Sequence, residues 1–507
     1  MFTLRHAKRS KTPTYVLTLE LDPTAAETIF LEKQFHWHRH LYNSILHILF
    51  QRYQQFIRRK DVQKLKRQFV AVSRRLGDQR KQDTEYQAIL QQLIDIQNEC
   101  GLSEAHAYTL QKEMRKLFPN SYQAIANNIA SRAWNAIFKL ISGEADRVNF
   151  VPKNAFPSFE AKSNDEAIRF KNQQIHFHGF QSDLIFNNEL YEQEALLHRT
   201  KFCRLVRKEI RNKVRYYVQL MQEGIPPVKR NKNGSFRHFL GSGPVGMDVN
   251  VRTFAIVAPN HVDLQAFCES LKDQHNEIAS LQRKIDRSIR TSNPENYNQN
   301  GTIKKGKKIW IYSKRCLKLK EKIKQLHRKQ AIHRLQLHRM ATNQALRLGD
   351  HFIGEKLNFQ LMMKRSKVVA FHANGKRKRT KRFGKSVGHT APGTYWRLLK
   401  QKVLAYGGQV TEVDTMSFCA SQYDHQSHTY TAKTLADRWH IFENQTNVQR
   451  DIYSAFLLQH SQPNGKKADR TACLKDFDAF YDLHEQWYQE CMLQNKQIPN
   501  SGLLNRP

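Results

Sequence analysis

The spacing of apolar residues in the first part of the chain predicts one strand followed by helices. Residues 13–22 (PTYVLTLELD) alternate between apolar and polar, which is typical of a β-strand. Thr24 with Glu27 three residues later forms a capping-box pattern, so we expect a helix to begin there. Helical periodicity follows, the polar stretch 60–98 predicts a solvated helical hairpin, and 120–142 predicts a further amphipathic helix.

The pattern changes near residue 148, where prolines and short aromatic runs replace the helical periodicity. Residues 213–222 (KVRYYVQLMQ) form the clearest strand of this region, and a Gly-Ile-Pro-Pro sequence ends it. We predict a small antiparallel barrel-like unit over 148–227, which the first strand of the chain would complete. Residues 228–243 (VKRNKNGSFRHFLGSG) indicate a basic linker.

Strands and helices alternate in the remainder of the chain, which predicts an α/β domain. The expected elements are strands within 245–259 and at 261–267, 351–355 and 410–413, two long helices within 269–350, and helices at 393–406 and from 451. After the last helix, we expect residues 466–507 to form a polar tail.

Composition adds a strong electrostatic constraint. The chain has 507 residues, enough for several domains, and its 83 Lys+Arg exceed its 45 Asp+Glu by a net charge of +38. A surface of this charge repels itself unless a polyanion neutralises it, so we expect a nucleic acid partner whose binding depends steeply on salt. The 29 Phe and 40% hydrophobic residues distinguish the chain from short basic proteins, since they can fill real cores.

Two long segments lack compensating acids. Residues 356–411 contain fourteen Lys+Arg and no Asp or Glu, and residues 302–340 contain one acid, Glu321. We predict that the first segment follows nucleic acid phosphates, which position a partner without specifying its sequence. Its densest part supplies the predicted nucleic-acid-binding residues Lys376, Arg377, Lys378, Arg379, Lys381 and Arg382.

The sequence also argues against several classes of protein. The first residues are polar and basic with no apolar run behind them, and no stretch of about 20 apolar residues exists, so we expect neither secretion nor a membrane span. Seven cysteines lack Cys-x-x-Cys spacing, so neither a disulfide framework nor a zinc ribbon is supported. A reducing cytoplasm fits this composition.

Three acids lie far apart in the chain, each at the edge of an apolar segment: Asp248, Glu355 and Asp451. Taken alone, each is the kind of residue found in a cap, on a surface or in an ion pair. Two of them lie on strands that would be neighbours in an α/β sheet, and the third opens a helix that can pack on it. Carboxylates that converge in this way can hold two Mg²⁺ or Mn²⁺ ions about 3.5–4 Å apart, which suits phosphodiester hydrolysis.

The segments around these acids carry a family resemblance. GMDVNVRTFAIV, IGEKLNF and QRDIYSAFLL, in this order, resemble the three RuvC motifs of transposon-encoded TnpB proteins and of compact type V CRISPR nucleases. TAAETIFLEKQFHWHRHLYNSIL, PSFEAK and VRKEIRNKVRYYVQLMQEG resemble the N-terminal helix and strand region of the same family. The resemblance covers most of residues 10–460.

The resemblance implies a multidomain α+β fold, in which a wedge β-barrel with an inserted helical recognition lobe precedes an RNase H-like (RuvC) α/β nuclease domain with a helical insertion. The implied boundaries are 1–30 and 148–227 for the barrel, 31–147 for the lobe, 228–243 for the linker, 244–414 for the nuclease domain with its insertion at 269–350, 415–447 for a target-strand loading segment, 448–465 for the final motif, and 466–507 for the tail.

The resemblance also implies a function: an RNA-guided DNA endonuclease in which Asp248, Glu355 and Asp451 are catalytic and bind two Mg²⁺ or Mn²⁺ ions. A guide RNA would pair with double-stranded target DNA beside a short flanking motif. The expected form is a monomeric ribonucleoprotein in the prokaryotic cytoplasm, associated with the nucleoid. A transposon or CRISPR origin stays open. Alternatives are a catalytically weak or inactive RNA-guided repressor of the same fold, or a DDE-type transposase.

One departure from the family concerns zinc. TnpB proteins carry a four-cysteine ribbon between the second and third motifs, and here only Cys419 remains in that place. His425, His428 and His440 lie nearby in the sequence, but their spacing is unlike that of a zinc site. We therefore expect no zinc, and a metal-free lid over 415–447 that still admits DNA to the site.

Overall fold

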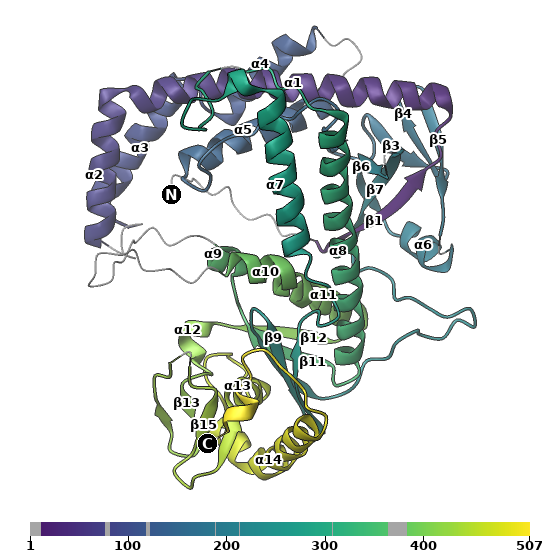
Figure 1. Ribbon diagram of the computed structural model, residues 1–507. Coiled ribbons are helices and arrows are strands. Elements are labelled where there is room, and N and C mark those ends of the chain that lie inside the picture. The colour runs from purple at the N-terminus through teal and green to yellow at the C-terminus, as the bar shows by residue number, and fades with distance from the viewer. Residues whose placement is uncertain are drawn as a thin grey trace. The chain divides into compact units, whose positions relative to one another are not determined.

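A computed structural model describes residues 12–76, 82–117, 122–187, 189–211, 213–306, 308–363, 383–434 and 436–506 (Figure 1). Contacts divide the chain into two compact units, Met1–Pro227 and Val228–Pro507. The predicted basic cluster from Lys376 to Arg382 lies outside the described residues. No helix in the described ranges is long and apolar enough to cross a membrane.

Helices make up the first part of unit 1. The predicted capping box begins α1, because Glu27 N–H donates to Thr24 Oγ1 (3.3 Å) and Thr24 N–H donates to Glu27 Oε2 (2.7 Å). The predicted hairpin is present as α2 and α3, whereas α4 was not predicted. The five helices are α1 Ala25–Arg58, α2 Lys60–Leu76, α3 Thr84–Glu99, α4 Glu104–Arg115 and α5 Gln123–Ile141. Helices α1 and α5 pack together through buried aliphatic side chains.

A seven-stranded sheet forms the rest of unit 1, in the order β2-β6-β7-β1-β5-β4-β3. The first strand completes it as predicted, since β1 pairs antiparallel with both β7 and β5. The strands are β1 Thr14–Leu21, β2 Ser158–Glu160, β3 Ile168–Lys171, β4 Gln174–Phe177, β5 Phe180–Ile185, β6 Thr200–Ile210 and β7 Lys213–Glu223, and helix α6 (Glu189–Leu196) precedes β6.

The sheet of unit 1 curls so that its edge strand β3 returns toward β6. Asn164 makes this connection: its Oδ1 accepts from Phe170 N–H on β3 (2.8 Å) and from the Cys203 thiol on β6 (3.2 Å). A side-chain amide replaces ladder hydrogen bonds at this point, so the polar groups of the edge are satisfied without a further strand.

A five-stranded sheet, in the order β10-β9-β8-β11-β12, is the centre of unit 2. Strands β8, β9 and β10 form an antiparallel meander, and β11 lies parallel to both β8 and β12. All five strands were predicted: β8 Pro244–Val249, β9 Thr253–Ala258, β10 His261–Ala266, β11 His351–Glu355 and β12 Gln409–Val413.

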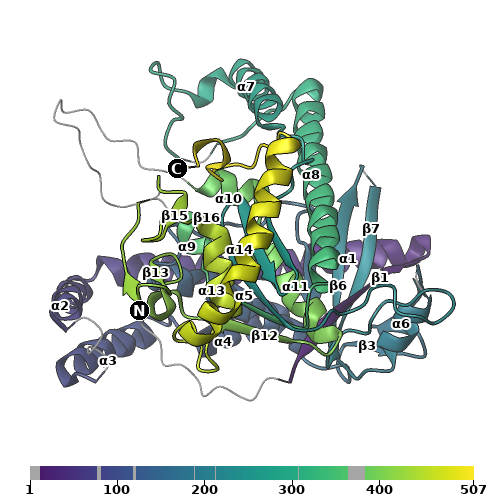
Figure 2. The same cartoon turned by 90° about the horizontal axis from the view of Figure 1, so that it is seen from below.

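Alternate residues of these strands fill two separate cores. Met247 and Phe352 pack on one face against Trp396 of α11 (Pro392–Ala405). Ile353 and Val413 belong to the opposite core, which includes α13 (Arg450–Gln459) and α14 (Arg470–Leu493). Figure 2 shows α13 and α14 beside one another, and their contact is direct.

The prediction of a polar tail over 466–507 is wrong for the residues that form α14, because this helix has a buried face. Its buried side chains recur every three or four residues, which is the spacing of a helical stripe: Cys473, Phe477, Phe480, His484, Trp487 and Cys491. Trp487 Nε1 also donates to Asp263 Oδ1 at 3.2 Å and ties the helix to β10. The charged residues between the buried positions obscured this stripe in the sequence.

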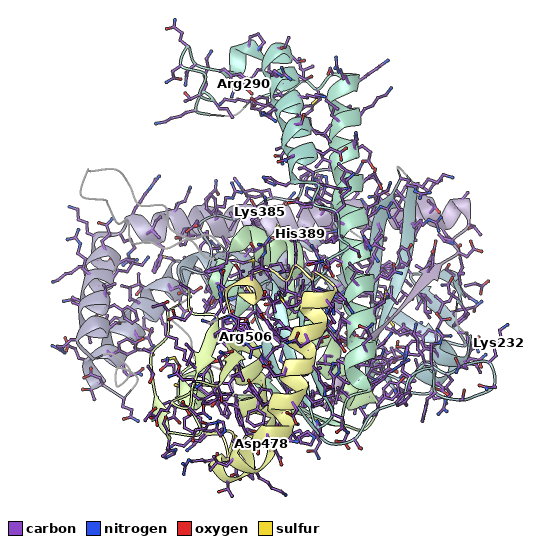
Figure 3. All side chains as sticks on the ribbon, turned by 60° about the horizontal axis from the view of Figure 1, so that its bottom comes forward. Lys232, Arg290, Lys385, His389, Asp478 and Arg506 are labelled. Atoms are coloured by element: carbon purple, nitrogen blue, oxygen red, sulfur yellow. The ribbon has the colours of Figure 1, made fainter. Side chains whose placement is uncertain are left out.

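The predicted helical insertion is a long hairpin of α7 (His275–Ser292) and α8 (Lys314–Leu346). The two helices run side by side in Figure 1, and Figure 3 shows Arg290 near the outer end of the hairpin. The remaining elements are short: α9 Phe359–Met363, α10 Gly384–Thr390, α12 Thr415–Phe418, β13 Tyr423–Asp424, β14 Thr429–Tyr430, β15 Trp439–Ile441 and β16 Asn447–Gln449, with 3₁₀ turns at Pro294–Asn296 and Leu503–Asn505.

Candidate active site

The register of two parallel strands places Asp248 beside Glu355. Gly354 of β11 is the partner of Met247 of β8, so the next residue on each strand is one of the two acids. Both acids therefore lie at the carboxyl end of their strands, on the same edge of the sheet. This is the edge at which α/β sheets usually bind their ligands.

Helix α13 brings Asp451 to the same edge. Gln459 Nε2 donates to Pro244 O (3.3 Å) at the start of β8, and a Cβ on Gly246 would overlap the backbone of Ala455. Gln459 thus lies beside Pro244, and Ala455 lies beside Gly246. Four residues advance about 6 Å along a helix and two residues advance about 6.7 Å along a strand, so the two elements stay in step. The next pair in this series is Asp451 and Asp248.

Gly246 allows this close approach because it has no side chain. A Cβ there would collide with the carbonyl oxygen of Ala455 and the amide nitrogen of Gln459, and both are backbone atoms that cannot rotate away. The helix thus packs its backbone directly on the strand, and the Asp451 side chain is only 7% exposed at the first turn.

The three predicted acids line one cavity of about 350 Å³. Liquid water occupies about 30 Å³ per molecule, so the cavity has room for about a dozen waters or a phosphodiester group with its ions. The other lining residues are mostly polar: Asn250, Thr415, Met416, Cys419, Ser421, Gln422, Lys433, Arg450 and Ser454.

Burial and mutual repulsion dominate the electrostatics of this cavity. Burial raises the pKa of Asp248 well above its usual value, and the nearby charges of Asp451 and Glu355 raise it further. Arg450 and the Asn250 amide, whose Nδ2 donates to Asp248 Oδ2 at 3.3 Å, offset only part of this effect. Burial also raises the pKa of Glu355. A cation in the cavity would relieve both effects.

Arg450 holds the third acid in place. Its guanidinium lies 3.3 Å from Asp451 Oδ1 and donates to the carbonyl oxygens of Thr434 (3.1 Å) and Asp437 (2.7 Å). The ion pair that the sequence suggested for Asp451 is therefore present. It links the last motif to the segment that precedes it.

The donor set of the cavity fits Mg²⁺ or Mn²⁺. Three carboxylates offer hard oxygen ligands, while the Cys419 thiol is directed to Met416 O at 3.2 Å. As the side chains stand in the described ranges, no group of three or more His, Cys, Asp or Glu residues is gathered closely enough to hold a metal ion. Mg²⁺ needs no such cage, because it is usually held by one or two carboxylates together with waters and substrate phosphate.

The segment expected to replace the zinc ribbon forms two short hairpins, β13 with β14 and β15 with β16. Each of its histidines contacts another protein group. His425 Nδ1 lies 2.7 Å from Tyr453 Oη, His428 Nδ1 lies 2.9 Å from Tyr423 Oη, and His440 Nε2 lies 3.1 Å from Asp424 Oδ2. The absence of zinc stays a prediction.

Unit 1 contains a larger cavity, of about 760 Å³, that the sequence did not reveal. Its wall includes Tyr122, whose ring stacks on His178 with centroids 3.9 Å apart, and the amides of Gln123 and Asn127 in the first turns of α5. Lys162 lines it as well. These residues come from three separate segments, so no local pattern joins them.

Comparison with known proteins gives only distant similarity. No family model and no curated protein matches the chain. Among solved structures, the chain is similar to a Cas12f1–sgRNA–target DNA complex, with 12% identity, coverage of 89% of this chain and 99% of that chain, and a TM-score of 0.41. The chain is also similar to a CRISPR-Cas12f ternary complex, with 12% identity, coverage of 88% of this chain and 86% of that chain, and a TM-score of 0.25. For a Cas12i complex with crRNA and double-stranded DNA, the identity is 11%, the coverage is 79% of this chain and 57% of that chain, and the TM-score is 0.21.

Proposed function

We propose that the protein is an RNA-guided DNA endonuclease with a single two-metal active site. The observation that carries the proposal is the convergence of Asp248, Glu355 and Asp451 in one cavity, at the sheet edge where β8, β11 and α13 meet. The three motifs that contain these acids resemble RuvC motifs. The mixed sheet, with its antiparallel meander and parallel β11 and β12, supports an RNase H-like domain.

The residues of the cavity prepare it for a cation and a phosphate. Asp248 and Glu355 are fixed by adjacent strands, and Arg450 fixes Asp451, so little side-chain freedom is lost when a ligand binds. Asn250 orients the Asp248 carboxylate. When bound, two Mg²⁺ or Mn²⁺ ions would activate water and stabilise the leaving oxygen of the phosphodiester.

Nucleic acid partners are supported by charge and by the cavity of unit 1. The net charge of +38 favours polyanion binding, and the aromatic and amide groups of Tyr122, Gln123 and Asn127 suit contact with nucleobases. The RNA guide is supported by the sequence resemblance alone. A chain of 507 residues is long enough to act as a monomeric complex, although some compact relatives pair up.

The test uses the full chain purified with its copurifying RNA. That RNA is sequenced, a matching double-stranded target is supplied with randomised flanking sequence, and cleavage is measured with Mg²⁺. We expect Asp248→Ala to abolish cleavage while guide and target affinities change less than about twofold. Asp478→Ala removes an exposed acid of α14 (Figure 3) and serves as the matched control, with wild-type cleavage expected.

The remaining outcomes separate the alternatives. Guided binding without cleavage by the wild-type protein would identify a repressor, and joined DNA ends would identify a strand transferase. Equal loss of binding and cleavage in Asp248→Ala would contradict the proposed site. The copurified RNA decides the origin, since a transposon-end transcript and a repeat-derived guide differ in sequence.

A further inference from the structure

Among the residues that the structure describes, two basic side chains line the candidate active site, and they have different roles. Arg450 is engaged with the Asp451 carboxylate and with two backbone carbonyl oxygens, so it fixes protein groups. Lys433 lines the same cavity as the three acids, and its ammonium contacts His440 Nδ1. Lys433 is therefore the basic group whose position suits contact with a substrate.

A network of hydrogen bonds through His440 and Asp424 holds Lys433 in position. An ammonium group can only donate, so His440 Nδ1 accepts, and the ring proton lies on Nε2. That nitrogen lies 3.1 Å from Asp424 Oδ2 and donates to it. Asp424 Oδ1 accepts in turn from the backbone N–H groups of Gln426 (2.8 Å) and Ser427 (3.2 Å). Both nitrogens of His440 and both carboxylate oxygens of Asp424 thus have hydrogen-bond partners.

The charge states agree with this assignment. Burial lowers the pKa of His440 below its usual value, and the charge of Lys433 also opposes protonation, so the imidazole is neutral. Burial raises the pKa of Asp424, but hydrogen bonds from His440 and the backbone outweigh it, and the carboxyl group is ionised. Burial lowers the pKa of Lys433 to about 8, so the amine is mostly charged at neutral pH.

Packing and backbone contacts hold the hydrogen-bond network of Lys433, His440 and Asp424 in place. The His440 ring packs against Phe442 and Tyr453, with centroid distances of 4.4 and 4.5 Å. His440 also pairs with Val448 in the β15–β16 hairpin, which leads directly into α13. Just after Lys433, the carbonyl oxygen of Thr434 accepts from Arg450. The lysine is thus held from two sides in a fixed relation to the third acid.

We propose that Lys433 is a further catalytic residue, which donates hydrogen bonds to the scissile phosphodiester, and that His440 and Asp424 position it. An ammonium group has three N–H donors; one is directed to His440, which leaves up to two for phosphate oxygens. The scissile phosphate and the three acids are all negative, so a fixed positive charge stabilises the charge that develops on the phosphate oxygens. The proposal rests on the proposed nuclease function.

The experiment measures single-turnover cleavage of a matched target by the assembled ribonucleoprotein at saturating Mg²⁺. We expect Lys433→Met to slow cleavage about 100-fold, as loss of one preorganised donor does elsewhere, with target affinity changed less than about twofold. Lys433→Arg keeps the charge and should recover at least tenfold of the loss. Lys466→Met removes an exposed lysine of the same unit and should cleave like wild type.

A double-mutant cycle tests the positioning residue. His440→Phe keeps a ring between Phe442 and Tyr453 but removes both hydrogen bonds, and we expect cleavage about tenfold slower. In the Lys433→Met background, the same substitution should have almost no further effect, because it acts through the lysine. A purely structural role for His440 predicts equal losses in both backgrounds.

The outcomes distinguish this proposal from the function on which it rests. Cleavage by wild type and loss in Asp248→Ala, together with an unchanged rate in Lys433→Met, would overturn the role of Lys433 and leave the nuclease intact. A parallel loss of thermal stability and cleavage, without recovery in Lys433→Arg, would also overturn it. A wild-type complex that cuts no target would overturn both.

Discussion

The candidate active-site cavity of unit 2 and the larger cavity of unit 1 differ in charge and in how the chain builds them. The cavity of unit 2 collects three carboxylates at one sheet edge, and two of them come from residues roughly 200 positions apart. The larger cavity of unit 1 combines stacked aromatic rings, amides and basic groups with two acids. The first suits cations and a reacting phosphate; the second suits nucleobases and their backbone. Chemistry and recognition are therefore expected to fail independently when either cavity is altered.

The largest expected effect separates catalysis from binding in unit 2. Glu355→Gln keeps the size of the side chain but removes a negative ligand at the end of β11. We expect cleavage to fall by about 1,000-fold, the upper range for loss of one electrostatic group, with guide and target binding unchanged. Rate and affinity measured on the same preparation check this, and a matching loss of affinity would argue against two independent cavities.

Gly246→Ala tests the approach of α13 to the sheet. The added methyl group would overlap the backbone of Ala455, so the helix has to move and carry Asp451 away from Asp248. We expect a loss of about 1–3 kcal/mol of stability in unit 2 and at least tenfold slower cleavage.

Gly388→Ala is the matched control for that helix displacement. Gly388 lies in α10, and a Cβ there meets no atom within 4 Å. Thermal unfolding and cleavage of this variant should match the wild type. If Gly246→Ala behaved like Gly388→Ala, the close packing of α13 on β8 would not be what places Asp451.

Tyr122→Ala alters the cavity of unit 1 and leaves the three acids of unit 2 in place. Tyr122 is 38% exposed and its ring stacks on His178. Loss of one stacking surface for a base weakens binding by about 1–3 kcal/mol. We expect target affinity to fall about tenfold, while the cleavage rate of the saturated complex is unchanged. Tyr122→Phe keeps the ring and should bind like wild type, and an equal loss in both variants would refute stacking.

The smallest expected effect concerns stability without metal. Since the folded-state pKa of Asp248 is raised, the folded protein holds the proton more tightly, and stability is lost as pH rises from the unfolded value of 3.8 through the raised pKa. Asp248→Asn removes this penalty at neutral pH. We expect its Tm without Mg²⁺ to rise by about 2–4 °C, with little further gain from added Mg²⁺. A lower Tm than wild type in metal-free buffer would contradict the repulsion between the acids.

The sequence predicted the strands that carry Asp248 and Glu355 because their signals are local. Apolar runs that end in an acid marked β8 and β11, and the parallel register then brought Asp248 and Glu355 together. Helices α4 and α14 were missed because charged residues interrupt their apolar stripes. The capping box of α1 was found, since it needs only four consecutive residues.

Residues that act through distant contacts had no signal in the sequence. Lys433 is one lysine in a polar segment, and its position in the active-site cavity depends on His440, Asp424 and Arg450. Tyr122 likewise becomes recognisable as part of a stacked pair only in the folded structure, where the turn between β4 and β5 places His178 beside it. Tertiary packing, which periodicity does not encode, decides both positions.

If Asp248, Glu355 and Asp451 form one two-metal site, EPR spectroscopy with Mn²⁺ should detect both ions. The full ribonucleoprotein is titrated with Mn²⁺ in the presence of a target whose scissile phosphate resists hydrolysis. We expect two Mn²⁺ ions about 3.5–4 Å apart, seen as an exchange-coupled spectrum that disappears in Glu355→Gln and persists in Asp478→Ala. An uncoupled spectrum that is identical in wild type and Glu355→Gln would contradict this two-metal site.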